Sequence, residues 1–307
     1  MNSLFKFLVI SFLISIFTSF NTTAFAEVKG SISSYFWSNQ GEFILEGKDP
    51  QVHNNWHISH PTDSLMLGAN TYLFEMEYDE TVSADLTING GFIDGKKQTY
   101  MVHNQQGYLR DLGYASAEGR SSLGSGGLFY RLMGKNKMAI SRLDIGVGYI
   151  GYKSSVTYKN PGVIIDWDNP LNNGRTFTED WEKYDIYYRG MDFRIKEEAF
   201  LTQDISVSLS AGYASHITAK YTSVKYPQRP VAQQQKNIIT AAGDSVHYDI
   251  RLNYYYSHHL SISGGYKYLL LRAEGDNHTN VYPMWNDSDQ KLKNEMGGFV
   301  LSVAYHF

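Results

Sequence analysis

The chain ends with the stretch GGFVLSVAYHF, residues 297–307, in which large apolar side chains alternate with smaller or polar ones. The apolar positions are Phe299, Leu301, Val303, Tyr305 and Phe307. A period of two places them on one face of a β-strand, because successive side chains of a strand point to opposite sides. The end of the chain therefore predicts an amphipathic strand whose apolar face needs a nonpolar environment.

The same alternation recurs along the chain, for example at 82–89, 205–213 and 246–254. Short turns are expected near 79–81, 134–137, 202–204 and 257–259, and long polar segments near 41–63, 96–118, 159–183, 226–244 and 276–292. Four short turns that alternate with five long segments predict ten strands. The strands are expected near 28–40, 64–80, 82–95, 119–134, 138–158, 184–203, 205–225, 245–258, 260–275 and 293–307.

These features predict an all-β protein that forms a closed antiparallel transmembrane β-barrel of about ten strands. In lipid every backbone amide needs a partner, so spanning strands must close into a cylinder without edges. An even strand number gives short periplasmic turns and long outer loops. The terminal Phe307 on an amphipathic last strand resembles the assembly signal of bacterial outer-membrane barrels. We therefore expect an outer-membrane protein that contacts membrane lipid, with lipopolysaccharide as a candidate partner.

The start of the chain has the pattern of a secretory signal peptide. Lys6 gives a positive start, residues 7–17 are apolar apart from two serines, and Ala24-Phe25-Ala26 is a small-x-small cleavage site. The alternative is a membrane anchor, for which the apolar run is short. We expect a signal peptide at 1–26 and one barrel domain at 27–307.

The composition excludes several classes of protein. Aromatic residues make up 15% of the chain, which is too many for a disordered protein because such side chains need burial. A net charge of −4 provides no basic stripe, so no nucleic-acid partner is expected. The chain has 0 cysteines, which excludes disulfides and thiolate metal sites. No metal or cofactor is predicted.

Charged residues at alternate strand positions are expected to point into the barrel. They are Glu75, Glu77, Asp85, Arg131, Asp144, Asp192, Arg194, Lys196, Asp249, Arg251 and Lys267. Because a ten-stranded barrel is narrow, their mixed signs favour a filling network of salt bridges, with a conducting channel as the alternative. Tyrosines near strand ends are expected to form an interfacial girdle. They are Tyr72, Tyr78, Tyr149, Tyr184, Tyr254 and Tyr305.

One motif in the third long segment, Asp166-Trp167-Asp168, could carry chemistry. Carboxylates at positions i and i+2 of an extended segment point to the same side. Close like charges raise the pKa of one carboxyl group, which suits the positioning or deprotonation of water. The alternative is a polar surface loop with turn-forming residues.

A second motif lies in the fifth long segment, where Asp276 and His278 share one side of the chain. A carboxylate can orient an imidazole and stabilise its charged form, which makes the histidine a candidate general base. Glu274 adds a negative charge on the same face that could hold a cationic substrate side chain. The alternative is again a solvated loop.

Taken together, the two motifs resemble the omptin family of outer-membrane endopeptidases, with a likeness that covers about residues 143–307. An omptin is a ten-stranded barrel with an aspartate pair on its outer rim. An Asp-x-His dyad faces the pair across a cleft, and the two activate a water that cleaves peptides next to basic residues. The resemblance implies that Asp166 and Asp168 position the water, that Asp276 orients the base His278, and that Glu274 recognises the basic side chain.

The motifs lie on the third and fifth outer segments, whereas the omptin pairs lie on the second and fourth. In that register the second segment offers only Asp94 and His103, and the fourth has no Asp-x-His. The sequence therefore leaves alternatives open. The leading hypothesis is a surface endopeptidase that acts on a peptide or protein substrate at the outer rim and prefers basic sites. Another is a non-enzymatic omptin-like barrel that acts as an adhesin, a surface-binding protein or a structural protein. A small porin is the third, disfavoured by the expected filled interior.

Overall fold

The computed structural model describes the chain from residue 28 to its end, with gaps. The described residues are 28–48, 55–61, 64–75, 82–103, 109–134, 141–167, 169–176, 178, 180–225, 227, 229–279 and 289–307. The expected signal peptide at 1–26 lies outside them and stays a prediction.

Nearly all of the described chain is β-strand, in one antiparallel sheet. The strands are β1 (Val28–Lys48), β2 (Asn55–Pro61), β3 (Ser64–Glu75), β4 (Val82–His103), β5 (Leu109–Met133), β6 (Ser141–Asp166), β7 (Asp180–Phe200), β8 (Ile205–Lys225), β9 (Gln235–Ser257), β10 (Leu260–Thr279) and β11 (Asp289–His306). Two short 3-10 helices lie in the connections between strands, η1 (Pro170–Asn172) between β6 and β7 and η2 (Val231–Gln233) between β8 and β9. In the described part of the chain, no helix is long and apolar enough to cross a membrane.

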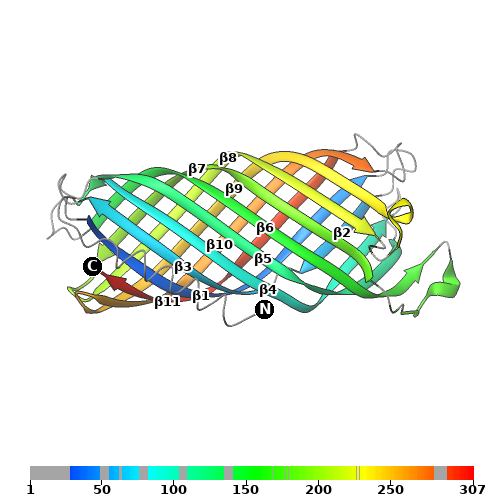
Figure 1. Cartoon of the computed structure of the whole chain (residues 1–307), viewed down its shortest axis with the longest axis horizontal. Helices are drawn as coiled ribbons and strands as arrows, with labels where there is room; N and C mark the ends of the chain where they lie inside the picture. The colour runs from blue at the N-terminus through cyan, green and yellow to red at the C-terminus, as the bar shows by residue number, and fades with distance from the viewer. Residues whose placement is uncertain are drawn as a thin grey trace.

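The sheet closes on itself into a barrel (Figure 1). β2 and β3 both pair with β1 on one side and β4 on the other, so the eleven described strands fill ten positions of the ring. β11 pairs with β1, and the backbones of Gly30 and Phe307 exchange two hydrogen bonds of 3.1 and 3.0 Å. Closure gives the last strand a partner on both sides. The fold predicted from the sequence is confirmed.

The strands are about twice as long as a membrane requires. β6 has 26 residues and β11 has 18, whereas a tilted transmembrane strand needs roughly 9–11 residues. Much of the segments 41–63, 96–118 and 226–244, which were expected to be loops, is therefore strand. The short turns expected at 202–204 and 257–259 are confirmed, and those near 79–81 and 134–137 lie mostly outside the described residues.

One half of the barrel carries an outward-facing apolar belt, next to the short turns. Its members include Leu86, Ile88, Leu128, Ile145, Val147, Phe193, Ile195, Ile250, Leu252, Ile262, Phe299, Leu301 and Val303. Phe193 is 70% exposed and Phe299 74% exposed, and a continuous belt of such side chains requires lipid. Three of the expected girdle residues, Tyr149, Tyr254 and Tyr305, are also exposed on this half. This half spans the outer membrane.

The other half of the barrel has an aromatic core inside it. The ring centroid of Phe43 on β1 lies 5.8 Å from that of Tyr184 on β7 and 5.7 Å from that of Tyr221 on β8. β1 and β7 are five positions apart in the ten-position ring, so this contact crosses the lumen. Tyr158 stacks on Tyr184 at 5.6 Å, and all four rings are fully buried. The lumen of the outer half is therefore filled by side chains.

This core corrects one expectation. Tyr184 was expected in the interfacial girdle, but it is 0% exposed and contacts rings from three other strands. It lies inside because β7 continues well beyond the membrane and keeps its inward register there. The side chains of Tyr72 and Tyr78 lie outside the described residues.

Candidate functional site

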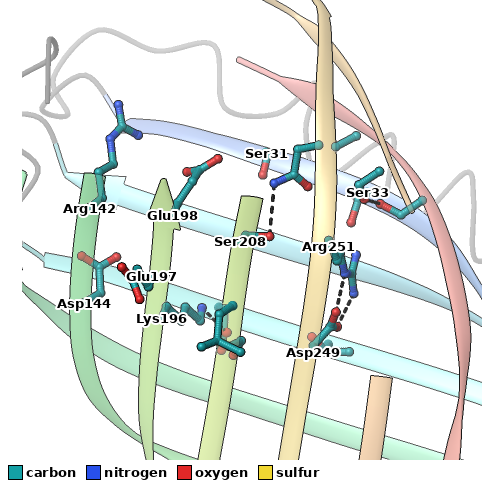
Figure 2. Close-up of a pocket in the computed structure, with 18 of the residues that line it drawn as sticks. Ser31, Ser33, Arg142, Asp144, Lys196, Glu197, Glu198, Ser208, Asp249 and Arg251 are labelled. Atoms are coloured by element: carbon teal, nitrogen blue, oxygen red, sulfur yellow. Dashed lines mark hydrogen bonds and ion pairs between the residues drawn. The ribbon is translucent and has the colours of Figure 1, made fainter. Parts of the chain in front are cut away.

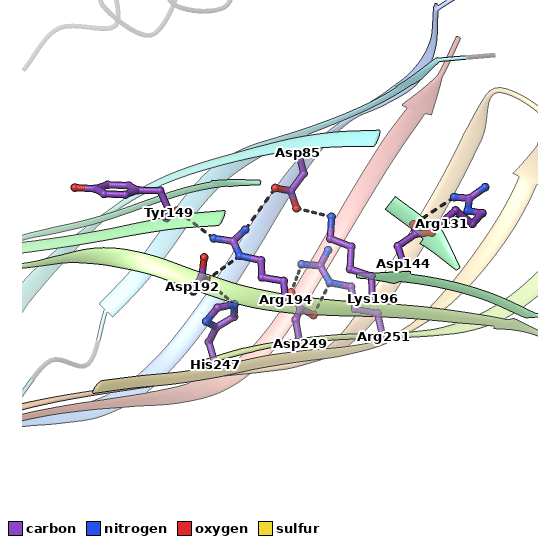
Figure 3. Close-up of polar contacts among 10 residues, drawn as sticks. All are labelled: Asp85, Arg131, Asp144, Tyr149, Asp192, Arg194, Lys196, His247, Asp249 and Arg251. Carbon is purple, nitrogen blue, oxygen red and sulfur yellow. Dashed lines mark hydrogen bonds and ion pairs between the residues drawn. The ribbon is translucent and has the colours of Figure 1, made fainter. Parts of the chain in front are cut away.

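A network of buried charges fills the membrane half of the barrel (Figure 3). Arg194 donates hydrogen bonds to Asp192 at 2.8 Å and to Asp85 at 3.4 Å, and Lys196 donates to the other oxygen of Asp85. Since buried charges need partners, this pairing lets polar side chains line a barrel inside lipid.

Two further ion pairs extend the network. Arg131 contacts both oxygens of Asp144, at 2.8 and 3.3 Å, and Arg251 contacts both oxygens of Asp249, at 2.7 and 2.5 Å. The expected inward placement of the charged residues is confirmed wherever their side chains are described. The side chains of Glu75 and Glu77 lie outside the described part of the chain.

The first predicted motif lies at the tip of β6. The Asp166 carboxylate accepts a hydrogen bond from the backbone N–H of Asn169 at 2.8 Å and another from Nδ2 of Asn172 at 2.9 Å. The Asp166 backbone N–H donates to Oδ1 of Asn173 at 2.7 Å. This carboxylate therefore stabilises the turn that contains η1. Asp168 lies outside the described residues.

The second motif lies near the end of β10 that leads into the fifth outer connection. Glu274, Asp276 and His278 occupy alternate positions, opposite in face to the buried Leu271 and Ala273. Since Leu271 and Ala273 point into the barrel, the three polar side chains lie on its outer wall. Glu274, Asp276 and His278 are all exposed. The structure brings these three residues together on one face, as their spacing predicts.

The two motifs are separated by several strands. β6 and β10 lie four positions apart in the ring, with β7, β8 and β9 between them. The strand order places the motifs at the third and fifth outer connections. The omptin arrangement requires the dyad to face the aspartate pair across a cleft, whereas Asp276 and His278 lie on the outer wall. The roles assigned to Asp166, Asp168, Asp276, His278 and Glu274 stay predictions.

The segment that joins β6 to β7 projects beyond the mouth of the barrel (green, lower right in Figure 1). It folds as a narrow hairpin, in which Val163 N–H donates to Arg175 O at 2.9 Å and Gly174 N–H to Val163 O at 2.8 Å. Trp167 is 67% exposed and Leu171 77% exposed at its tip. The sequence showed Trp167 only as a spacer between two aspartates, so this apolar tip was missed.

The first outer segment contains His53, His57 and His60, and the side chain of His57 is described. Nδ1 of His57 lies 3.0 Å from Oε1 of Glu46, whereas His53 and the side chain of His60 lie outside the described residues. Within the described ranges, no group of three or more His, Cys, Asp or Glu side chains could hold a metal ion.

Comparison with known proteins supports the fold. No family model matches this sequence, and no curated protein matches it. The chain is similar in structure to the outer membrane protease OmpT from Escherichia coli, with a TM-score of 0.73, 9% identity, and 94% of this chain and 99% of that chain covered. It is less similar to the translocator domain of the autotransporter NalP from Neisseria meningitidis, with a TM-score of 0.35, 10% identity and coverage of 98% and 96%. The fold is therefore that of an omptin-like outer-membrane barrel.

Proposed function

We propose that this omptin-like barrel is a surface-binding protein, whose outer half is a rigid stalk that presents the hairpin between β6 and β7 to a macromolecular partner outside the cell. The observation that carries the proposal is the exposure of Trp167 and Leu171 in that hairpin, which as a segment projects beyond the barrel mouth. Large apolar side chains exposed on a protrusion are typical of interaction sites.

The filled outer half supports this function in two ways. The contact of Phe43 with Tyr184 and Tyr221 joins opposite walls, so the stalk is stiff and the hairpin keeps its position. A rigid scaffold lowers the entropy that binding costs. The same contact occupies the lumen that a porin would need to keep open.

The test is a binding screen with the refolded barrel against extracellular matrix proteins and surface polysaccharides. We expect that Trp167→Ser with Leu171→Ser weakens binding to any partner found by about tenfold or more, because exposed aromatic and aliphatic anchors dominate such contacts. Leu201→Ser is the matched control, because Leu201 is 64% exposed in the turn between β7 and β8, at the other end of the barrel. Equal loss in the control, or retention by the double variant, would reject the proposal.

A surface endopeptidase is the second candidate. It is supported by the shared face of Asp276 and His278 on β10, with Glu274 beside them, and by the structural likeness to an outer membrane protease. In this mechanism Asp166 and Asp168 position a water molecule. Asp276 orients His278, which acts as the base. Glu274 holds the basic side chain of the peptide.

The endopeptidase is tested with fluorogenic peptides rich in Arg and Lys, in the presence of lipopolysaccharide. The mechanism requires that His278→Ala abolishes cleavage while the barrel stays folded, and that His258→Ala has no effect. His258 is exposed in the short turn between β9 and β10, at the opposite end of the barrel from the outer rim. No cleavage by a folded wild-type barrel would leave the binding function as the better account.

A further inference from the structure

A polar cavity of about 310 Å³ lies inside the membrane half of the barrel (Figure 2). It extends from the charged network to the ends of β1 and β11, where Ser31, Ala304 and His306 line it. These strand ends lie on the side of the short turns, so the cavity faces the periplasm. Its described lining includes no residue of the hairpin between β6 and β7 or of the predicted rim motifs.

One serine in the wall of this cavity is hydrogen-bonded to a histidine. Oγ of Ser261 on β10 lies 2.8 Å from Nε2 of His306 on β11. A hydroxyl group at this distance from an imidazole can pass its proton to the ring as it attacks an electrophile, which is the arrangement of an activated serine nucleophile. Both residues line the cavity, so a small molecule that enters the cavity can reach the pair.

The imidazole of His306 is held in place from two directions. Its ring packs against that of Tyr255 on β9, with centroids 5.7 Å apart, and the hydroxyl group of Tyr255 donates to Oε1 of Glu198 at 2.6 Å. The backbone of His306 is fixed by His259, whose carbonyl oxygen accepts from the His306 N–H at 2.9 Å. Nδ1 of His259 also lies 3.0 Å from the His306 carbonyl oxygen. A base fixed in this way needs little reorganisation when it accepts a proton.

The space beside Ser261 suits a carbonyl group. Ala304 on β11 lies opposite Ser261 on β10 and opposite Ser33 on β1, and all three line the cavity. Two strand spacings separate the two serines by roughly 10 Å at their Cα atoms, and only a methyl group stands between them. A carbonyl group above Ala304 therefore meets Ser261 at its carbon atom and the Ser33 hydroxyl at its oxygen, where a donor stabilises the oxyanion that forms.

We propose that Ser261 and His306 form a nucleophile–base pair that hydrolyses small polar esters entering from the periplasm. Nε2 of His306 takes the proton of Ser261 while the serine oxygen bonds to the ester carbonyl carbon, and Ser33 donates to the oxyanion. The bond to the alcohol oxygen then breaks, and His306 gives the alcohol its proton. Water cleaves the acyl-serine by the same route, which releases the acid and restores the hydroxyl group of Ser261.

The wall of the cavity determines the class of ester. A volume of about 310 Å³ is at the lower end for small-molecule sites. The wall carries serine hydroxyls and charges of both signs, so it favours a neutral polar molecule over a fatty acyl chain. The charged residues are Arg131, Arg142, Arg194, Lys196, Arg251, Lys267, Asp85, Asp144, Glu197, Glu198 and Asp249. The site does not involve the outer hairpin, so it holds whether or not the surface-binding function does.

The test uses the refolded full chain in detergent, with p-nitrophenyl acetate as the ester and a fluorophosphonate as a serine-reactive probe. We expect p-nitrophenol to be released above the buffer rate, and a phosphonyl adduct on Ser261 to be identified by mass spectrometry. Ser261→Ala should remove this adduct and lower the rate of release by about tenfold or more. His306→Gln should lower both the labelling and the release by about tenfold or more, because the base is lost.

Ser263→Ala is the matched control. Ser263 lies two residues along the same face of β10 and lines the same cavity, but its hydroxyl group contacts that of Ser302 at 3.0 Å. This variant should leave both the adduct and the rate of release unchanged. Ser33→Ala should lower the rate of release by about tenfold or more, because the oxyanion loses a donor.

Three outcomes would overturn the proposal. One is the absence of an adduct on Ser261 in a wild-type barrel that migrates as a folded, heat-modifiable species. Another is an unchanged rate of release in Ser261→Ala, and the third is an equal loss in Ser263→Ala. Each result would mean that the hydrogen bond between Ser261 and His306 only joins β10 to β11. The position of the adduct is read on the wild-type chain, so the test stands even if a variant fails to fold.

Discussion

The membrane half and the outer half of this barrel are built from the same strands, yet their inner and outer faces exchange character. On β6, Asp144 points inward and Ile145 and Val147 outward in the membrane half. Farther along the same strand Tyr158 points inward, and Lys153 lies on the outer wall. Between Asp144 and Tyr158 the ladders of β6 and the period of two continue without a break. Since only the surrounding solvent changes, it is the solvent that decides which face of each strand is apolar.

The largest effect is expected in the core of the outer half. Tyr184→Ala removes a ring that contacts Phe43, Tyr158 and Tyr221. We expect the free energy of unfolding to fall by about 4 kcal/mol, because the substitution leaves a cavity among fully buried rings. Denaturant titration measures it. The control Tyr187→Ala, on the outward face of the same strand, should change stability by less than about 1 kcal/mol.

A charge introduced on the outward face of a strand should affect stability differently in the two halves. We expect Val147→Arg to lower stability in lipid by about 3 kcal/mol, because it places a charge in the hydrocarbon. Thr157→Arg, ten residues along the outer face of β6, should have almost no effect because that position meets water. Similar losses at both positions in a lipid-based unfolding titration would contradict the division into halves.

Breaking the buried network should have a somewhat smaller effect. Asp85 accepts hydrogen bonds from both Arg194 and Lys196. Asp85→Asn leaves two cations short of a partner, and we expect a loss of about 2–3 kcal/mol, since the adjacent cavity lets water reach them. Asp204→Asn, in the exposed turn between β7 and β8, is the control and should leave the unfolding midpoint unchanged.

The hairpin should contribute least to stability. Trp167→Ser with Leu171→Ser changes exposed side chains, so the free energy of unfolding should shift by no more than about 0.5 kcal/mol. A larger loss would mean that the tip packs on the barrel and is not a free binding surface. The same unfolding titration serves as the measurement.

The sequence predicted the membrane half well because its two faces differ strongly there. On β11 the apolar residues from Phe299 to Tyr305 face outward and alternate with smaller or polar ones. On β7 apolar outward residues alternate with inward charges, so both strands can be recognised in the sequence. In the outer half the contrast weakens, since outward residues such as Lys236 and Thr240 of β9, in a segment that was expected to be a loop, are polar like those of a loop. The strand ends were therefore placed too early, and Tyr184 was assigned to the girdle instead of the core.

The candidate site was less predictable for local reasons. The spacing of Asp276 and His278 gives a shared face but does not say which face. Continuing the parity of the inward Leu271 and Ala273 would have placed them on the outer wall. At Asp166 the register shifts beyond Tyr158 remove even that guide, and the asparagines that follow use its carboxylate to form a turn. Because Asp and Asn side chains often stabilise turns in this way, a segment rich in these residues does not by itself predict a catalytic site.

The central claim is that the outward face of each strand is apolar in the membrane half and polar in the outer half. The most direct test is spin labelling along the outward face of β6 in lipid bilayers. Single cysteines at 145, 147, 153 and 157 are unique thiols because the chain has 0 cysteines. We predict that labels at 145 and 147 are more accessible to oxygen, which concentrates in lipid, and labels at 153 and 157 to a water-soluble nickel complex. The same environment at all four positions, whether lipid or water, would contradict the account.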